Sequence, residues 1–329
     1  MLKDSKKLLS IIIPHYNTPE LLEKLILTIP DYDDIQIIVV DDKSNVQLDK
    51  LNGIKAKYNH RIEFYINDTL KKGAGTCRNI GLHHANGKWI LFADSDDFFT
   101  DNMYESVSPY FETDYDEVFF IPTSIYIDTG ETSNRHIVLE KRINDYNHNP
   151  TRDNLLKLKV ATATPVSILI NNNIIKKYKI KFDEVLYSND IMFMTKVGHY
   201  SQKITTSKNV IYCITRNKGS LTTHISHDVY KIRLQEYVKV CRFLLKNYSV
   251  KDVKIMHYTC VVALYGAIKR HYGIKECLSV LKVLRKYNVP FFSFDLLKLD
   301  YIKQLLNDFK QQYADSKYLI KTQNINKKV

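Results

Sequence analysis

Short apolar runs alternate with amphipathic stretches along the first hundred residues. Residues 8–14 (LLSIIIP) are apolar almost throughout, which is typical of a strand buried on both faces of a sheet. Behind Thr18, a favoured N-cap residue, and Pro19, apolar side chains recur at helical spacing as far as Ile29. The whole pattern predicts strand–helix–strand–strand–helix–strand, with strands at 8–14, 35–42, 61–67 and 88–94 and helices within 15–29 and 75–87.

This alternation predicts the α/β class, a mainly parallel sheet flanked by helices. Ligands of such sheets bind beyond the carboxyl ends of the strands. Three polar clusters follow predicted strands in this chain: Tyr16-Asn17, Asp41-Asp42 and residues 94–97 (DSDD). They are far apart in the sequence, but we expect them to share one crevice.

The middle of the chain carries a weaker pattern. Residues 117–127 predict a strand, and the polar residues 141–153 predict a loop. A helix is expected to begin near Asp190, and residues 209–223 are expected to form a strand that enters a loop.

From residue 228 onward the sequence is basic and patterned for helices. We therefore predict a first domain at 1–227 and a helical region at 228–329. The helical region is expected to contact a substrate of the first domain, a second copy of the chain in a homo-oligomer, or an anionic membrane as a peripheral protein. A solvated packing domain is the alternative.

Composition places further bounds on the protein. No stretch approaches the roughly 18 continuous apolar residues of a membrane span. The first apolar run ends at Pro14 without a small-residue cleavage site, so a buried strand is preferred over a signal peptide. The five cysteines are scattered and include no CxxC pair, which disfavours a disulfide framework or a zinc site and favours a reducing compartment. We expect a cytoplasmic protein, at the inner face of the cell membrane if it binds lipid.

The net charge of +12 suits a polyanionic partner. Nucleic acid, anionic lipid and phosphorylated small molecules all meet this description. A nucleic-acid-binding surface would interleave basic and aromatic residues, and the sequence holds no such motif. We therefore expect no nucleic acid, although the charge alone does not choose between the other partners.

The densest group of carboxylates in the chain follows the strand at 88–94. Asp94, Asp96 and Asp97 would repel one another, and burying one unpaired would be costly. Hard divalent cations prefer carboxylate oxygens, and magnesium-type sites use one or two carboxylates plus substrate phosphates. The sequence therefore suggests a metal site. In the alternative, Asp96 or Asp97 caps a helix that begins near Thr100.

Four segments together resemble one known family. SIIIPHYN, IIVVDDKS, GAGTCRNIGLHHANGKWILFADSDD and FDEVLYSNDIMF are similar, in this order, to nucleotide-sugar-dependent glycosyltransferases of the GT-A fold, family 2. The resemblance covers residues 8–223, about two-thirds of the chain. It implies a Rossmann-like GT-A domain at 1–227 that binds a nucleotide-sugar and carries the catalytic residues.

The resemblance also implies which residues bind the donor. Pro14, Tyr16 and Asn17 would flank the base, and Asp41 or Asp42 would accept a hydrogen bond from the uracil N3–H. The other implied donor-binding residues are Asn67, Gly75, Arg78, Asp94, Ser95 and Arg216.

Two basic stretches would meet the diphosphate of the donor. GAGTCRN resembles the glycine-rich stretch of the family, in which Gly75 allows close approach and Arg78 binds the diphosphate. An intrahelical pair of Arg78 is the alternative. Arg216 in ITRNKGSLTT would clamp the diphosphate, with help from Lys218, whereas a lone His224 is more often structural than a metal ligand.

The same resemblance assigns the reacting groups. Asp96 would hold Mn²⁺ or Mg²⁺ against the diphosphate, and Asp94 would lie nearer the ribose or the metal. Asp190 would be the general base, beside Asn189, which departs from the glutamate usual in the family. In the alternative, Asn189 or Asp190 is simply the N-cap of a helix.

The implied function is an inverting transfer of a hexosyl or N-acetylhexosaminyl group. The donor would be a nucleotide-sugar, with UDP favoured by the resemblance, and the acceptor a glycan or a lipid-linked precursor of a bacterial surface polysaccharide such as a capsule. Two rivals remain open. One is a nucleotidyltransferase-like enzyme on a similar fold, and the other is a non-catalytic basic module that binds nucleic acid.

Overall fold

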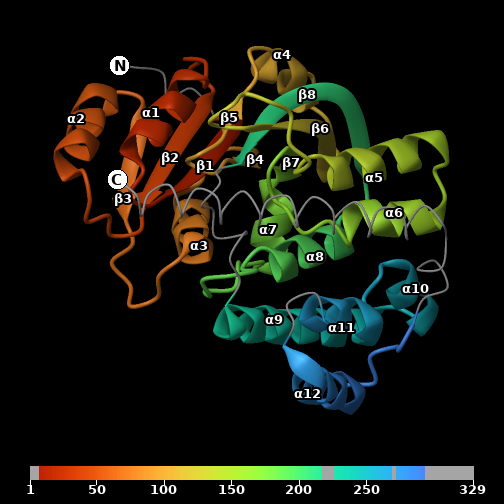
Figure 1. The fold of residues 1–329 in the computed structure, drawn as a ribbon. Coiled ribbons are helices and arrows are strands. Elements are labelled where there is room, and N and C mark those ends of the chain that lie inside the picture. Colours follow the sequence, from red (N-terminus) through yellow and green to blue (C-terminus); the bar gives the residue numbers. More distant parts are fainter. Residues whose placement is uncertain (1–6, 217–225, 269–271, 293–329) are drawn as a thin grey trace. The chain divides into compact units, whose positions relative to one another are not determined.

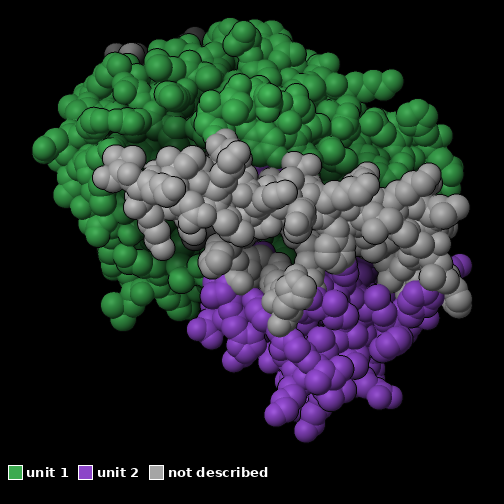
Figure 2. All heavy atoms as spheres, viewed as in Figure 1, with its two compact units in different colours: residues 1–215 green, residues 216–329 purple. Residues whose placement is uncertain are grey.

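The computed structural model describes residues 7–216, 226–268 and 272–292. The chain divides into two compact units, residues 1–215 and 216–329 (Figure 2). Each unit is considered by itself below. The roles predicted for a first domain at 1–227 and a helical region at 228–329 stay predictions.

The first unit is built on one sheet of eight strands in the order β3-β2-β1-β4-β7-β6-β8-β5 (Figure 1). The strands are β1 (Leu9–His15), β2 (Ile35–Asp41), β3 (Ile62–Ile66), β4 (Trp89–Phe92), β5 (Phe98–Phe99), β6 (Glu117–Tyr126), β7 (Ile168–Asn171) and β8 (Ile204–Arg216). β1 lies beside β2 and β4 in the middle of the sheet, and every one of its residues is buried, as its largely apolar sequence predicts.

Parallel pairing joins the first four strands. β1 pairs in parallel with β2 and with β4, and β2 pairs in parallel with β3. The pairs β4–β7, β6–β7 and β5–β8 are antiparallel. The predicted α/β class and the four predicted N-terminal strands are confirmed, and the antiparallel pairs extend this parallel core.

Helices cover both faces of the sheet. Residues of α1 (Pro19–Leu27), α2 (Leu48–Tyr58) and α4 (Met103–Val107) pack in one apolar core, with a short 3₁₀ turn at Ser108–Tyr110 following α4. The opposite core receives side chains from α3 (Ala74–His84), α5 (Ile137–His148), α6 (Arg152–Lys159), α7 (Asn172–Tyr178) and α8 (Ile191–Tyr200). The result is a three-layer α/β/α arrangement.

The loop predicted for residues 141–153 was wrong. The segment lies mostly in α5, and α6 begins at Arg152. α5 buries only Leu139 and Ile143, one turn apart, so its polar majority concealed the helical period. α2 went unpredicted for the same reason, because its three buried residues stand among lysines and polar side chains.

The second unit is helical in the part of the chain that the structure describes. It contains α9 (His227–Asn247), α10 (Val250–Ile255), α11 (Cys260–Ile268) and α12 (Gly273–Lys286). The helical pattern predicted from residue 228 is therefore confirmed for these segments, and the pattern within 294–310 lies outside the described residues. Among the helices described in either unit, none has the length and apolar character needed to cross a membrane.

A fully buried carboxyl group lies at the start of β6. Neither oxygen of the Glu117 carboxyl has a hydrogen-bond partner among the described residues, and the side chain is not exposed. Burial raises the pKa of Glu117 to about 8, and nearby Ser201 and Lys159 oppose this rise only in part. Burial also lowers the pKa of Lys159. The folded chain therefore holds a proton on Glu117 at neutral pH.

Glu117→Gln tests this assignment through stability. The unfolded chain releases the Glu117 proton near pH 4.5 and the folded chain near pH 8, so this residue should lower the free energy of unfolding as pH rises through that window. The neutral amide cannot titrate, so the variant should gain about 1.4 kcal/mol per pH unit over the wild type across this window. Urea denaturation at several pH values measures the difference. Parallel stability curves for the two proteins would contradict the assignment.

Candidate active site

The three polar clusters predicted to share one crevice lie at the same edge of the sheet (Figure 1). The parallel register places His15 beside Asp41 at the ends of β1 and β2. β4 runs parallel to β1 on its other side and ends just before the third cluster. Thr18, the residue after the first cluster, contacts the third cluster, because its Oγ1 lies 3.4 Å from Ser95 Oγ. The expectation that these segments converge is therefore confirmed.

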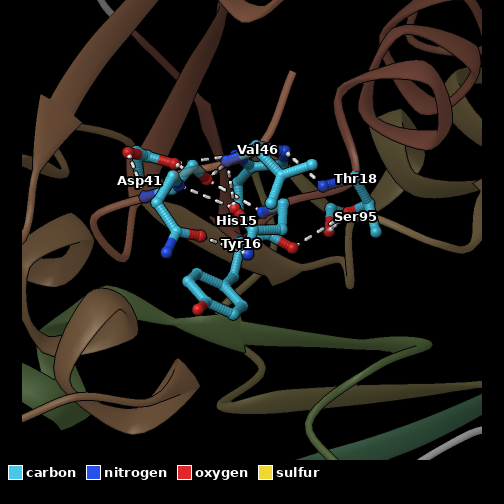
Figure 3. Close-up of polar contacts among 9 residues, drawn as sticks. His15, Tyr16, Thr18, Asp41, Val46 and Ser95 are labelled. Atoms are coloured by element: carbon cyan, nitrogen blue, oxygen red, sulfur yellow. Dashed lines mark hydrogen bonds and ion pairs between the residues drawn. The ribbon is translucent and has the colours of Figure 1, made fainter. Parts of the chain in front are cut away.

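A buried histidine missed by the sequence analysis links the ends of β1 and β2 (Figure 3). His15 Nδ1 lies 2.9 Å from Asp41 Oδ1, and His15 Nε2 lies 3.3 Å from the backbone nitrogen of Thr18. Because Nε2 accepts the Thr18 N–H, we assign the ring proton to Nδ1, which then donates to Asp41. The signal in the sequence was a polar residue directly after an apolar run.

Both carboxylate oxygens of Asp41 accept hydrogen bonds from neighbouring residues. Burial opposes its ionisation, but hydrogen bonds from His15 and Ser44 hold the pKa of Asp41 below its usual range. Ser44 donates from both its hydroxyl and its backbone N–H. Asp41 therefore braces the turn after β2 as a carboxylate. That it also contacts a base stays a prediction.

Asp42 braces the loop after β3 in a similar way. Its Oδ1 accepts from Asn67 Nδ2 at 2.6 Å, and its Oδ2 accepts from the backbone N–H of Gly73 at 2.8 Å. Gly73 has a φ of 120°, a conformation that favours glycine. Asp42 and Asn67 are both buried, so their shared role in the structure is to shape this loop.

The turn after β1 combines a structural residue with an exposed ring. Asn17 Oδ1 accepts from the backbone N–H groups of Asn45 at 2.8 Å and Val46 at 3.1 Å, which ties the turn to the loop after β2. The Tyr16 ring points away from this network and is 45% exposed (Figure 3). Pro14 is buried within β1. Of these three predicted base contacts, Tyr16 is the one whose side chain is available to a ligand.

Arg78 is the centre of a network that joins α3, β4 and the loop before α8. Its side chain is buried, donates to Asp94 Oδ1 through Nη2, and donates to Asn189 Oδ1 through Nη1 at 3.0 Å. The guanidinium carbon lies 5.3 Å from the centre of the Phe182 ring. A Cβ atom at Gly75 would lie 2.8 Å from Asn189 Cβ, so glycine allows this close approach. The intrahelical pair considered for Arg78 was wrong, and its contact with a diphosphate stays a prediction.

Asn189 secures the loop that carries Asp190. The side-chain Nδ2 of Asn189 donates to the Val185 carbonyl at 3.3 Å, and the backbone carbonyl of Asn189 accepts from the Asp183 N–H at 3.1 Å. Asp190 occupies the N-cap position of α8, but its side chain makes no capping hydrogen bond. The alternative in which Asp190 serves to cap the helix is therefore not supported. The general-base role stays a prediction.

Asp97 is the structural member of the acidic cluster. It is buried and accepts from the Tyr212 hydroxyl at 2.9 Å and from the Thr215 N–H at 2.7 Å. Helix α4 has Asn102 at its N-cap position, so neither Asp96 nor Asp97 caps it. The capping alternative was wrong because Asp97 turns toward β8.

Asp94 and Asp96 form the solvent-accessible half of the cluster. Asp96 is exposed and Asp94 is partly exposed. Partial burial, followed by the negative charge of Asp94, raises the pKa of Asp96 to about 6, and Arg135 opposes this rise. Among the described residues, Arg78 forms an ion pair with Asp94.

The pair fits a divalent cation bound together with a ligand. The described residues contain no group of three or more His, Cys, Asp or Glu side chains placed to hold a metal. Two carboxylates alone give a partial coordination shell, which substrate phosphates complete in magnesium-type sites. Asp94 and Asp96 would hold the ion, and a cation there would relieve the repulsion that raises the pKa of Asp96.

Arg216 is the last residue of β8 and follows Thr215 directly. The Thr215 hydroxyl donates to the backbone carbonyl of Asp96 at 2.6 Å, so the end of β8 is joined to the acidic cluster. The predicted contact of Arg216 with a diphosphate stays a prediction. Lys218 and His224 lie outside the described residues.

Solved structures share this fold. A crystal structure of Staphylococcus aureus TarS 1-349 in complex with UDP-GlcNAc has a TM-score of 0.66 and 18% identity, over 85% of this chain and 80% of that one. Mannosyltransferase PcManGT from Pyrobaculum calidifontis, in complex with GDP-Man and Mn²⁺, has a TM-score of 0.52 and 16% identity, over 94% and 85%. At these identities the likeness concerns the fold.

Curated relatives match parts of the chain. The Campylobacter jejuni GalNAc(5)-diNAcBac-PP-undecaprenol β-1,3-glucosyltransferase is 37% identical over 91 residues, 27% of this chain and 29% of that protein. The S. aureus poly(ribitol-phosphate) β-N-acetylglucosaminyltransferase TarS is 24% identical over 285 residues, 81% of this chain and 44% of that protein. The chain thus spans less than half the length of either relative.

The sequence model of a whole family gives the broader match. The model described as glycosyl transferase family 2 covers residues 10–179, just over half of the chain. These residues include most of β1, all of β2, Arg78 on α3 and the acidic cluster after β4. The chain therefore belongs to glycosyl transferase family 2.

Proposed function

We propose that the protein is an inverting glycosyltransferase. It would transfer a hexosyl or N-acetylhexosaminyl group from a UDP-sugar to a hydroxyl of a bacterial surface glycan or its lipid-linked precursor. The observation that carries the proposal is the Arg78 network of a family 2 chain, which joins Asp94 of the acidic cluster to Asn189, the neighbour of Asp190. The network thereby holds the carboxylate proposed to bind the metal and the loop of the proposed general base near one another.

The relatives support the choice of substrates. TarS is named as an enzyme that glycosylates poly(ribitol-phosphate), and its structure holds UDP-GlcNAc. The Campylobacter enzyme is named for an undecaprenol-linked glycan. Both names give a polymer or lipid-linked acceptor, and the TarS structure gives a UDP-sugar donor. We carry them to this chain as its proposed substrates, with the enzyme working at the inner face of the cell membrane.

The proposed reaction uses Asp190 as the general base. Its carboxylate takes the proton of the acceptor hydroxyl while that oxygen bonds to the anomeric carbon, and the bond from this carbon to the diphosphate oxygen breaks on the opposite face. Arg216 would stabilise the departing diphosphate. A bound Mg²⁺ or Mn²⁺ held by Asp94 and Asp96 would neutralise phosphate charge.

Calorimetry of UDP binding tests the donor site and its metal. We expect UDP to bind in the presence of Mn²⁺, to be released by EDTA, and to bind at least about tenfold more weakly to Asp96→Ala, because Asp96 would lose its share of the cation. Asp68→Ala removes an exposed carboxylate from the loop after β3 and serves as the charge-matched control. Binding that ignores both EDTA and Asp96→Ala would overturn the metal assignment.

Two further assays, read together with UDP binding, distinguish the rival functions. A nucleotidyltransferase would prefer a nucleoside triphosphate and release pyrophosphate, and a nucleic-acid-binding module would retain an oligonucleotide in a filter assay at moderate salt. Either result without UDP binding would contradict the proposed glycosyltransferase.

A further inference from the structure

The described part of the second unit is strongly basic. Residues 226–268 and 272–292 contain eleven Lys and Arg against four Asp and Glu. Three of these acids face inward or are paired: Glu236 and Asp252 are buried, and Glu276 Oε2 lies 3.2 Å from His227 Nε2. The surface cations of these described residues are therefore hardly offset by acidic groups within the same ranges.

Helix α12 carries an apolar stripe that faces away from its own unit. Val280 and Leu284, one turn apart, are fully buried and hold the helix in place beside α11 (Figure 1). Ile274 and Leu278, also one turn apart, are 73% and 58% exposed. Leu281 continues this second stripe at helical spacing and is partly exposed. The helix thus has an apolar surface beyond the one used for packing.

Cations border the exposed stripe. Lys275, Lys282 and Lys286 follow one another at spacings of seven and four residues, so they share one side of α12. Arg285 lies one turn beyond Leu281, at the end of the stripe, and all four cations are exposed. Long basic side chains of this kind can lay their methylene stems on an apolar surface while their charged ends reach outward.

We propose that α12 binds an anionic membrane surface, with Ile274, Leu278 and Leu281 entering the boundary between headgroups and acyl chains and the flanking cations meeting lipid phosphates. A basic amphipathic helix lies in this plane when its apolar face is buried. The phosphates of a nucleic acid would pair with the cations, but a nucleic acid provides no apolar environment in which the exposed stripe could be buried. A second copy packed on this face would bring like charges together. This inference does not rest on the proposed function.

Vesicle flotation of the full chain tests the proposal. We expect binding to vesicles of equal phosphatidylglycerol and phosphatidylcholine at about 50 mM salt, and binding at least about tenfold weaker to pure phosphatidylcholine or at about 500 mM salt. Ile274→Ser combined with Leu278→Ser should weaken binding to the anionic vesicles about tenfold or more. Lys275→Glu combined with Lys282→Glu should weaken binding to the anionic vesicles to a similar extent, because the new carboxylates repel lipid phosphates.

Leu27→Ser provides the matched control, because Leu27 is a 68% exposed leucine on α1 of the first unit. It should leave flotation unchanged, and circular dichroism should show all variants folded. Equal binding to both vesicle types, unweakened binding of the Ile274/Leu278 variant, or no flotation of the wild type would each overturn the proposal. A Ile274/Leu278 variant that changes oligomeric state without changing flotation would assign the stripe to a second copy instead.

Discussion

Asp190→Asn is expected to lower kcat for sugar transfer by about a thousandfold while leaving UDP binding within a factor of about two. The amide keeps the shape of the side chain but cannot take a proton from the acceptor hydroxyl. Asp190 does not cap α8 through its side chain, so this replacement leaves the helix start intact. The neighbouring contacts of Asn189 with Arg78 and Val185 also remain.

Glu184→Gln is the matched control for this experiment. Glu184 lies on the same loop, and its carboxylate bonds to Lys71 at 2.7 Å rather than to the network around Asp94. The variant should keep kcat within about twofold of the wild type, since it changes one exposed charge. Transfer is measured as UDP release with a saturating UDP-sugar and acceptor. An Asp190→Asn enzyme that keeps more than a tenth of wild-type kcat would refute the general-base assignment.

The strands at the centre of the sheet could be predicted from the sequence because burial on both faces leaves a continuous apolar run. Residues 8–14 and 35–42 have such runs, and both correspond to strands whose residues are all buried. Helices such as α5 escaped prediction because two buried residues suffice to anchor them, and the exposed polar majority dominates the pattern. Strand direction beyond β4 was also missed, since nothing in an apolar run distinguishes parallel from antiparallel pairing.

The convergence of the site could be predicted, but the partners of each side chain could not. Parallel strands ending at one edge bring their terminal residues together, which follows from topology alone. That Asn17 and Asp42 hold loops, whereas Tyr16 and Asp96 reach solvent, depends on turn geometry such as the φ of 57° at Asn17. His15 and Asn189 were not recognised as anchors because their hydrogen bonds span 26 and 111 positions of the chain.

Arg78→Met should cost both stability and turnover. The guanidinium holds Asn189 of the loop before α8 and Asp94 after β4, so its loss removes a donor from the buried Asn189 Oδ1 and an ion-pair partner from Asp94. Because Asp94 is partly exposed, we expect about 2 kcal/mol of lost stability rather than the larger cost of breaking a fully buried pair. The freed loop carries Asp190, so kcat should also fall about a hundredfold.

Arg61→Met is the control for Arg78→Met. It separates a loss of stability, measured by urea denaturation, from a loss of kcat, measured by UDP release. Arg61 precedes β3, and its Nη2 donates to the carbonyls of Ile29 at 2.9 Å and Pro30 at 3.2 Å, at the opposite edge of the sheet. Its replacement should lower stability by about 1 kcal/mol, through lost hydrogen bonds, without changing kcat.

Arg78→Lys should recover part of the stability but little of the turnover, because one ammonium group does not reproduce the planar fork that reaches both partners. If Arg78→Met and Arg61→Met proved equal in kcat, the Arg78 network would hold the fold together without positioning the base.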